Sequence, residues 1–247
     1  MTQVRVFPDL QHLSRAAAEC VVSAARHGVR ARGRFSVALA GGSTPRVLYR
    51  LLACTPYRAQ MPWPSVHCFW TDERCVPPEH AKSNFRMAHT AWLSHVPLPP
   101  ANIHRIVVEQ RTPAQAAARY AQVLRAFFPV ADGAWPAFDL ILLGLGEDGH
   151  TAALFPRSPA VQETRRLVTP SVGDRPALPR ITLTLPVLNH ARQLLWLVAG
   201  RRKAAIVRLV LQGQASPETV PARRVRPVTG DACWFLDQAA ARQLLAS

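Results

Sequence analysis

FDLILLGLGEDGHTAALFP, residues 138–156, carries the clearest pattern of a strand followed by a glycine-rich loop. Its first six residues are almost wholly apolar, which is typical of a strand buried on both faces in a parallel sheet. The loop that follows holds Gly144, Gly146 and Gly149, which favour an irregular backbone, and then a single histidine, His150. A buried strand that opens into such a loop predicts an α/β fold with polar residues gathered beyond the strand ends.

Short apolar runs alternate with longer helical patterns along the rest of the chain. Strands are expected at 4–7, 35–40, 66–70, 103–107, 138–143, 167–170, 194–199 and 234–236, and helices at 9–27, 45–53, 83–94, 112–128, 186–191, 201–212 and 237–245. This alternation predicts a mostly parallel, doubly wound (Rossmann-like) sheet with helices on both faces. No stretch has linker composition, so we expect a single domain over residues 1–247.

The composition narrows the class of protein. With 247 residues and 49% hydrophobic content, the chain can bury a large core. No apolar run is long enough to span a membrane, and the N-terminus lacks the apolar segment of a signal peptide. Five scattered cysteines without a CxxC pair indicate neither a disulfide framework nor a zinc site. We therefore expect a cytoplasmic protein with no membrane partner and no metal.

The net charge is strongly positive, because 30 basic residues stand against 15 acidic ones and give +15. Charge of this size can bind phosphates or nucleic acid. The basic residues are spread along the chain, however, and all but Lys82 and Lys203 are arginines, which indicates a composition bias of the surface. No aromatic-interleaved basic stripe or helix-turn-helix pattern accompanies the charge. We expect no nucleic-acid partner.

A second glycine-rich turn follows an expected strand, in AGGSTPRVLYRLL, residues 40–52. Gly42 and the glycine before it would let the backbone approach an anion closely, and Ser43 or Thr44 could cap the helix, with Pro45 at its first position. Exposed N–H groups at a helix start favour phosphate. The spacing is neither a P-loop nor a dinucleotide fingerprint, so a plain tight turn is the alternative.

Charged residues stand at three further strand ends. Asp72 could order a substrate hydroxyl and Arg74 could hold an oxyanion, although adjacent opposite charges also occur in solvated loops. Arg180 and Lys203 would add positive charge, with ordinary surface charge as the alternative. Lys203 departs from the bias toward arginine, which hints that a compact ammonium is needed there.

His150 would stand at the start of the helix or turn that follows its loop. A helix N-terminus disfavours the imidazolium, which keeps histidine neutral and available as a base near pH 7. The alternative is a histidine that only caps or packs. Together these residues predict a phosphorylated small molecule as ligand and a histidine base without an obligatory metal. They do not name the reaction.

The motifs taken together resemble the 6-phosphogluconolactonases of the glucosamine-6-phosphate isomerase/6-phosphogluconolactonase family. The matching stretches are AGGSTPRVLYRLL, FWTDERCVP with SNF at 83–85, FDLILLGLGEDGHTAALFP, RITLTLPVLNHAR, LVAG followed by KA, and WFLDQAA. They run in family order from about residue 35 to 240. GGSTP alone would not be specific, but the ordered combination is.

The resemblance implies hydrolysis of 6-phospho-D-glucono-1,5-lactone to 6-phospho-D-gluconate in the oxidative pentose phosphate pathway, without a cofactor. It implies that His150 activates water and that Asp148 orients the base or the substrate, while Arg74 is a candidate donor to the carbonyl oxygen. The residues expected to bind the substrate are Gly42, Ser43, Thr44, Asp72, Asn84, Arg180 and Lys203. The expected partner is a small sugar phosphate, and the expected assembly a monomer or weak dimer.

One segment departs from the family pattern. The family often has a Pro-Lys-Pro-Pro-like segment before RITLT, whereas this chain has GDRPALPR at 173–180. Arg175 is the candidate replacement for that lysine.

Two other functions are open to a chain with these motifs. An amino-sugar-phosphate isomerase/deaminase would resemble this chain but have DEY in place of the stretch at 72–74 and GHIAFNEP in place of GHTAALFP. It would also need a glutamate soon after the histidine, and none occurs between His150 and Glu163. A non-enzymatic sugar-phosphate sensing domain would need a DNA-binding module, and no helix-turn-helix pattern precedes residue 34.

Overall fold

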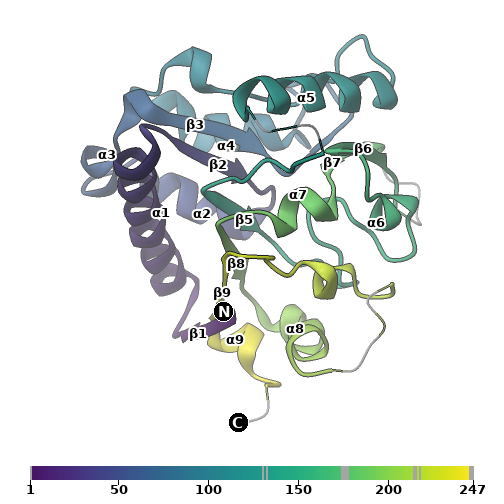
Figure 1. Cartoon of the computed structure of the whole chain (residues 1–247). Coiled ribbons are helices and arrows are strands. Elements are labelled where there is room, and N and C mark those ends of the chain that lie inside the picture. Colours follow the sequence, from purple (N-terminus) through teal and green to yellow (C-terminus); the bar gives the residue numbers. More distant parts are fainter. Residues whose placement is uncertain are drawn as a thin grey trace.

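Six strands form the central sheet of the computed structural model, which describes residues 2–129, 131, 133–173, 178–213, 216 and 218–244. The strands are β1 (Thr2–Phe7), β2 (Phe35–Leu39), β3 (Val66–Trp70), β5 (Leu140–Leu143), β8 (Gln193–Val198) and β9 (Asp231–Asp237). They lie in the order β1-β9-β8-β5-β2-β3, and every neighbouring pair is parallel (Figure 1). The expected parallel α/β sheet is confirmed.

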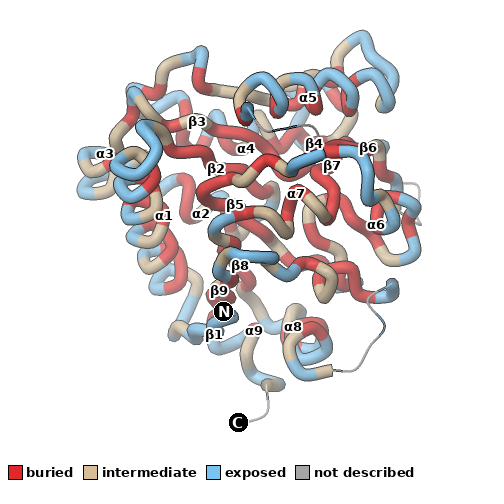
Figure 2. Tube along the Cα trace, in the orientation of Figure 1, coloured by how far each residue is buried: buried red, intermediate tan, exposed pale blue. Residues whose placement is uncertain are grey.

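Helices cover both faces of this sheet, as expected. α1 (Leu10–Arg32) and α2 (Ser43–Leu52) lie in connections that run toward β3, whereas α7 (Leu185–Asn189) and α8 (Ala204–Leu211) lie in connections that run toward β1. Because crossovers are right-handed, connections of opposite direction pass over opposite faces. Figure 1 shows α1 and α8 on opposite sides of the strands. The central strands β2 and β5 are consequently buried along their whole length, whereas the edge strand β1 is largely exposed (Figure 2).

The remaining helices follow local signals in the sequence. They are α3 (Tyr57–Gln60), α4 (Asn84–Ala91), α5 (Pro113–Phe127), α6 (Pro159–Gln162) and α9 (Gln238–Ala241). α5 begins at a capping box, in which the Thr112 side chain accepts from the Gln115 N–H and the Gln115 side chain accepts from the Thr112 N–H. The short helices α3 and α6 were not expected. None of the described helices has the apolar length that a membrane crossing requires.

A second, smaller sheet stands beside the first. It contains β4 (Asp72–Arg74), β7 (Arg180–Leu183) and β6 (Val168–Ser171), which pair antiparallel in the order β4-β7-β6. The strand expected at 167–170 therefore exists, but it belongs to this sheet. β4 and β7 were not expected, because three- and four-residue strands with charged ends carry no clear alternating pattern.

The strand expected at 103–107 is wrong. Only Ile103 forms a bridge, parallel to Cys68 of β3, and the His104 N–H donates to the Cys68 carbonyl at 2.8 Å. Beyond the bridge, residues 104–107 form no ladder with β3. Just after them the Glu109 carboxylate accepts from the Val108 N–H at 2.9 Å, so a side chain and not a strand satisfies that donor.

Candidate active site

A cleft of about 220 Å³ opens at the carboxyl ends of the parallel strands. The chain reverses its direction of travel across the sheet between β2 and β5, and crevices in α/β sheets form at such a point. The structure brings nine of the expected site residues to its walls, namely Gly42, Ser43, Thr44, Asp72, Arg74, Asn84, His150, Arg180 and Lys203. Asp148 reaches it through a hydrogen bond to His150. Arg175 lies outside the described residues.

The start of α2 forms one wall of the cleft. Gly42 is the N-cap and adopts a φ of 107°, a backbone conformation that favours glycine, so the helix begins at Ser43. The expectation that Ser43 or Thr44 caps the helix, with Pro45 at its first position, is wrong. No side chain in the described part of the chain caps this helix start. Its first N–H groups are therefore available to an anion in the cleft.

Glu73 fastens β4 to the start of α4. Its carboxylate accepts from the N–H groups of Arg74, Asn84 and Phe85 at 2.7–2.8 Å and from the Ser83 hydroxyl at 3.0 Å. Burial raises the pKa of Glu73, and these N–H bonds oppose that rise. Glu73 was not singled out in the sequence, although a carboxylate is a frequent partner of a helix start.

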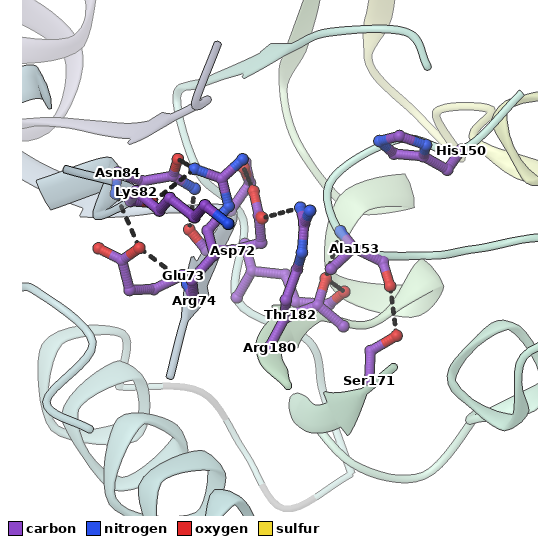
Figure 3. Close-up of polar contacts among 12 residues, drawn as sticks. Asp72, Glu73, Arg74, Lys82, Asn84, His150, Ala153, Ser171, Arg180 and Thr182 are labelled. Atoms are coloured by element: carbon purple, nitrogen blue, oxygen red, sulfur yellow. Dashed lines mark hydrogen bonds and ion pairs between the residues drawn. The ribbon is translucent and has the colours of Figure 1, made fainter. Parts of the chain in front are cut away.

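Asn84 holds Arg74 in the cleft. Its side-chain oxygen accepts from an Arg74 guanidinium nitrogen at 2.6 Å, and its amide nitrogen donates to the Asp72 carbonyl at 2.9 Å (Figure 3). The amide also lies against Gly41, where a Cβ atom would collide with it. Asn84 therefore links the strand that carries Arg74 to the backbone just before α2.

Arg180 lies opposite Arg74 in the register of β7 and β4. One of its terminal nitrogens lies 3.4 Å from the Asp72 carboxylate, and the guanidinium carbon lies 5.1 Å from the centre of the Phe155 ring. Its Nε atom is buried and has no hydrogen-bond partner among the described residues. Two arginines thus lie opposite each other at the cleft wall, an arrangement suited to an anion.

His150 and Asp148 form a close pair on the loop after β5. The His150 Nδ1 atom lies 2.5 Å from the Asp148 carboxylate, which also accepts from the His150 N–H at 3.1 Å. Burial alone would raise the pKa of Asp148, but the bonds and charge of His150 outweigh burial and lower it. With Nδ1 occupied, Nε2 is the ring nitrogen free to exchange a proton with a ligand.

His150 does not stand at a helix N-terminus, so no helix dipole acts on it. No helix begins at this residue, and the next described helix, α6, starts at Pro159. What orients the imidazole is its carboxylate partner. Gly146 makes the pair possible in another way, since a Cβ atom there would collide with the His150 ring and the Asp148 carboxylate. We expected Gly146 to favour an irregular backbone. Its φ is not positive, however, and glycine is required there because a side chain would not fit.

The small sheet holds the loop that carries His150. Ala153 donates its N–H to the Thr182 hydroxyl at 3.2 Å, and its carbonyl accepts from the Ser171 hydroxyl at 2.5 Å. Between His150 and this anchor the chain turns sharply at Ala152, with a φ of 49°. The loop is therefore tied to β6 and β7, the same sheet that carries Arg180. The signal missed in the sequence is the set of hydroxyl residues on those strands.

Lys203 reaches the cleft from the other side, after β8. It ends a single 3₁₀ turn, Arg201–Lys203, that leads into α8, and its side chain is half-buried. Burial lowers the pKa of Lys203, while Glu147 and Asp148 oppose this decrease. The ammonium therefore stands near the loop of His150. The expected helix start at this position is confirmed.

The described residues contain no group of three or more His, Cys, Asp or Glu side chains placed to hold a metal ion. The five cysteines are free thiols.

Comparison with known proteins places the chain in a family. The sequence pattern of the glucosamine-6-phosphate isomerases/6-phosphogluconolactonase family matches residues 8–234. The chain belongs to this family. It is 44% identical to a 6-phosphogluconolactonase of Synechocystis over 98% of both chains, and 40% identical to the human 6-phosphogluconolactonase over 98% of this chain and 93% of the human one.

Solved structures of the family have the same fold. The 6-phosphogluconolactonase from Trypanosoma cruzi is 28% identical and covers 100% of this chain and 98% of its own, with a TM-score of 0.87. The family fold therefore extends over the whole chain, and both sheets belong to it.

Proposed function

We propose that the chain is a 6-phosphogluconolactonase, which hydrolyses 6-phospho-D-glucono-1,5-lactone to 6-phospho-D-gluconate in the oxidative pentose phosphate pathway. The observation that carries the proposal is the His150–Asp148 pair beside a cleft whose lining includes Arg74, Arg180, Lys203 and the uncapped start of α2. The curated relatives with this name, 40–44% identical over nearly the whole chain, support it.

His150 acts as the general base. Its Nε2 takes a proton from water while the water oxygen bonds to the lactone carbonyl carbon, and Asp148 at Nδ1 stabilises the imidazolium that forms. When the bond from that carbon to the ring oxygen breaks, the imidazolium returns the proton to the ring oxygen, which becomes a hydroxyl. A positioned base of this kind contributes about 10²- to 10⁴-fold to the rate.

Arg74 and the N–H groups of loop 144–149 stabilise the negative charge that develops on the carbonyl oxygen. Arg74 is suited to this because it lines the cleft and Asn84 fixes its guanidinium at 2.6 Å. A donor that is already oriented needs no rearrangement when charge develops.

The phosphate binds at the start of α2, on the N–H groups of Gly42, Ser43 and Thr44 and on the hydroxyls of Ser43 and Thr44. Arg180 and Lys203 supply positive charge, and Asp72 and Asn84 face the hydroxyl groups of the sugar. Anchoring the phosphate fixes the distance from the anchor to the carbonyl carbon, so that one base acts on one position.

The chain acts as one sugar-phosphate lactonase domain over residues 1–247, in the cytoplasm and as a monomer or weak dimer. A small sugar phosphate is its partner, and nucleic acid is not.

The test uses freshly generated 6-phosphogluconolactone, with product followed through 6-phosphogluconate dehydrogenase. Purified protein is expected to accelerate hydrolysis well above the spontaneous rate and to release no ammonia from glucosamine 6-phosphate. Lactone hydrolysis no faster than the spontaneous rate would show that the proposal is wrong. Ammonia release without lactone hydrolysis would instead assign the chain to the isomerase/deaminase branch.

A further inference from the structure

One aromatic ring contacts both the proposed base and the proposed phosphate-binding arginine. The Phe155 ring centre lies 4.8 Å from that of the His150 imidazole and 5.1 Å from the Arg180 guanidinium carbon. Phe155 is 7% exposed, so its ring is buried, and the His150 imidazole and the Arg180 guanidinium both pack against it. No other described aromatic ring contacts either of them.

Hydrogen bonds alone hold Arg180 weakly. Its contact with the Asp72 carboxylate is long, at 3.4 Å, and its Nε has no partner in the described part of the chain. A hydrogen bond of that length restrains a guanidinium little. The face of Phe155 restrains it further, since a planar cation prefers to lie over an aromatic ring.

His150 also needs a second restraint. The bond from Nδ1 to Asp148 fixes one atom of the ring but leaves the imidazole free to tilt about that contact. Phe155 packs against the ring at an interplanar angle of 47°, and Gly146 leaves the room that the ring occupies. Carboxylate and aromatic ring together define where Nε2 points.

Phe155 is itself fixed by its surroundings. It follows Ala153, whose N–H and carbonyl are both bonded to the small sheet, and the neighbouring residues Thr151 and Leu154 form a bridge. Gly173, just after β6, lies near the ring, since a Cβ atom there would stand at van der Waals distance, 3.5 Å, from it. The backbone that leads to the ring is therefore tied to the small sheet.

We propose that Phe155 is a positioning residue that couples the proton-transfer group to the phosphate anchor, by holding His150 and Arg180 on one rigid ring. This rests on the proposed function. Its expected signature is that loss of the ring changes both kcat and KM, because it loosens one group that acts on the reacting carbon and one that binds the anchor.

The first test compares Phe155→Leu and Phe155→Tyr with Phe128→Leu, a control that is also 7% exposed and packs against Phe69 and Phe138 away from the cleft. Phe155→Leu should lower kcat about ten-fold and raise KM about three-fold, by loss of orientation. Phe155→Tyr, which keeps the ring, should restore both to within about two-fold. Unchanged kcat and KM in Phe155→Leu, or equal losses in the control, would overturn the proposal.

The second test places Phe155→Leu in an Arg180→Lys background. If the ring acts on binding through the guanidinium, the rise in KM should disappear there while the fall in kcat persists. Effects on KM that simply multiply would overturn the coupling to Arg180.

A third measurement needs no activity. The His150 Cε1–H signal in ¹H–¹³C spectra, assigned with His150→Gln, should shift in Phe155→Leu because the ring current is lost, and an unshifted signal would contradict the contact. Wild-type protein without lactonase activity would instead overturn the proposed function, so the two failures are distinguishable.

Discussion

Arg74 and Arg180 occupy directly opposed positions on the antiparallel strands β4 and β7. Like charges placed opposite each other in a sheet repel. The carboxylate of Asp72 stands near Arg180 at 3.4 Å, whereas Arg74 is held by neutral oxygens of Asn84 and Lys82. The two guanidinium groups therefore repel each other at the cleft, and a bound anion would offset this repulsion.

Inorganic phosphate should stabilise the folded protein for this reason. At about ten times its dissociation constant, a ligand that binds only the folded state adds about 1.4 kcal/mol, or roughly 3–6 °C in the thermal midpoint for a chain of this length. Arg180→Gln should lose most of this gain, whereas Arg208→Gln, exposed on α8, should keep it. Thermal unfolding with and without phosphate measures the effect, and an equal gain in all three proteins would contradict it.

His150→Ala should lower kcat by about 10²- to 10⁴-fold, because it removes the proposed base. The fold should persist, since the side chain stands beside an open cleft and is 28% exposed. The coupled lactonase assay measures kcat, and circular dichroism checks the fold. His27→Ala, on the exposed side of α1, is the control. Turnover near that of the wild type would show that the base has been assigned to the wrong residue.

Gly146→Ala should disrupt the His150–Asp148 pair although neither of those residues is changed. A methyl group at residue 146 collides with His150 and Asp148, so we expect a loss of at least about 10²-fold in kcat, as for a missing base. Gly144→Ala is the matched change, because no described atom lies within 4 Å of a Cβ there. The downfield NMR signal of the His150 Nδ1 proton should vanish in the first variant and persist in the second. If the signal persists in both variants, a methyl group at residue 146 does not displace His150 or Asp148.

Lys203→Ala should act mainly on binding. Removing a half-buried ammonium from the cleft should raise KM about ten-fold or more and change kcat less. Lys203→Arg should recover only part of the loss, because a planar fork does not replace a compact charge. Steady-state kinetics separates the two constants. Lys82→Ala is the control, since only its backbone carbonyl contacts Arg74. A fall in kcat at constant KM would contradict the binding role.

The sequence allowed the positions of the site residues to be predicted, but not the way they are held. Strand ends could be found from apolar runs, and parallel strand ends meet at one edge, so His150 and Lys203 could be expected together. The supports could not be found in this way. Glu73 and Asn84 act through hydrogen bonds between β4 and the start of α4, which no local sequence pattern reveals. The missing side chain of Gly146 matters only once His150 is placed. Phe155 reads as an ordinary core residue until its two neighbours are known.

Acid should destabilise the protein through a pair of histidines far from the cleft. His67 Nδ1 lies 3.2 Å from His104 Nε2, and His104 stacks on Phe69. Burial, and secondarily the neighbouring His67, lower the pKa of His104 from 6.5 to about 4. Between pH 4 and 6.5, His104 is protonated in the unfolded chain but not in the folded protein. The free energy of unfolding should therefore fall as pH decreases from 6.5 to 4.

Urea unfolding at several pH values across this window measures the effect. His104→Phe should flatten the decline, because the stacked ring remains and the titrating group is gone. His27→Gln, an exposed histidine, should leave the decline unchanged. An identical decline in His104→Phe would show that other groups cause it.

The proposed base and the proposed phosphate anchor come from separate parts of the chain. His150 belongs to one short loop after β5, whereas the helix start at Ser43, Arg180 and Lys203 belong to three other segments. A change confined to residues 144–150, which leaves Phe155 in place, could therefore alter which bond is broken while the proposed phosphate-binding residues stay unchanged. New reactions on one class of substrate could then arise from a few substitutions in one loop.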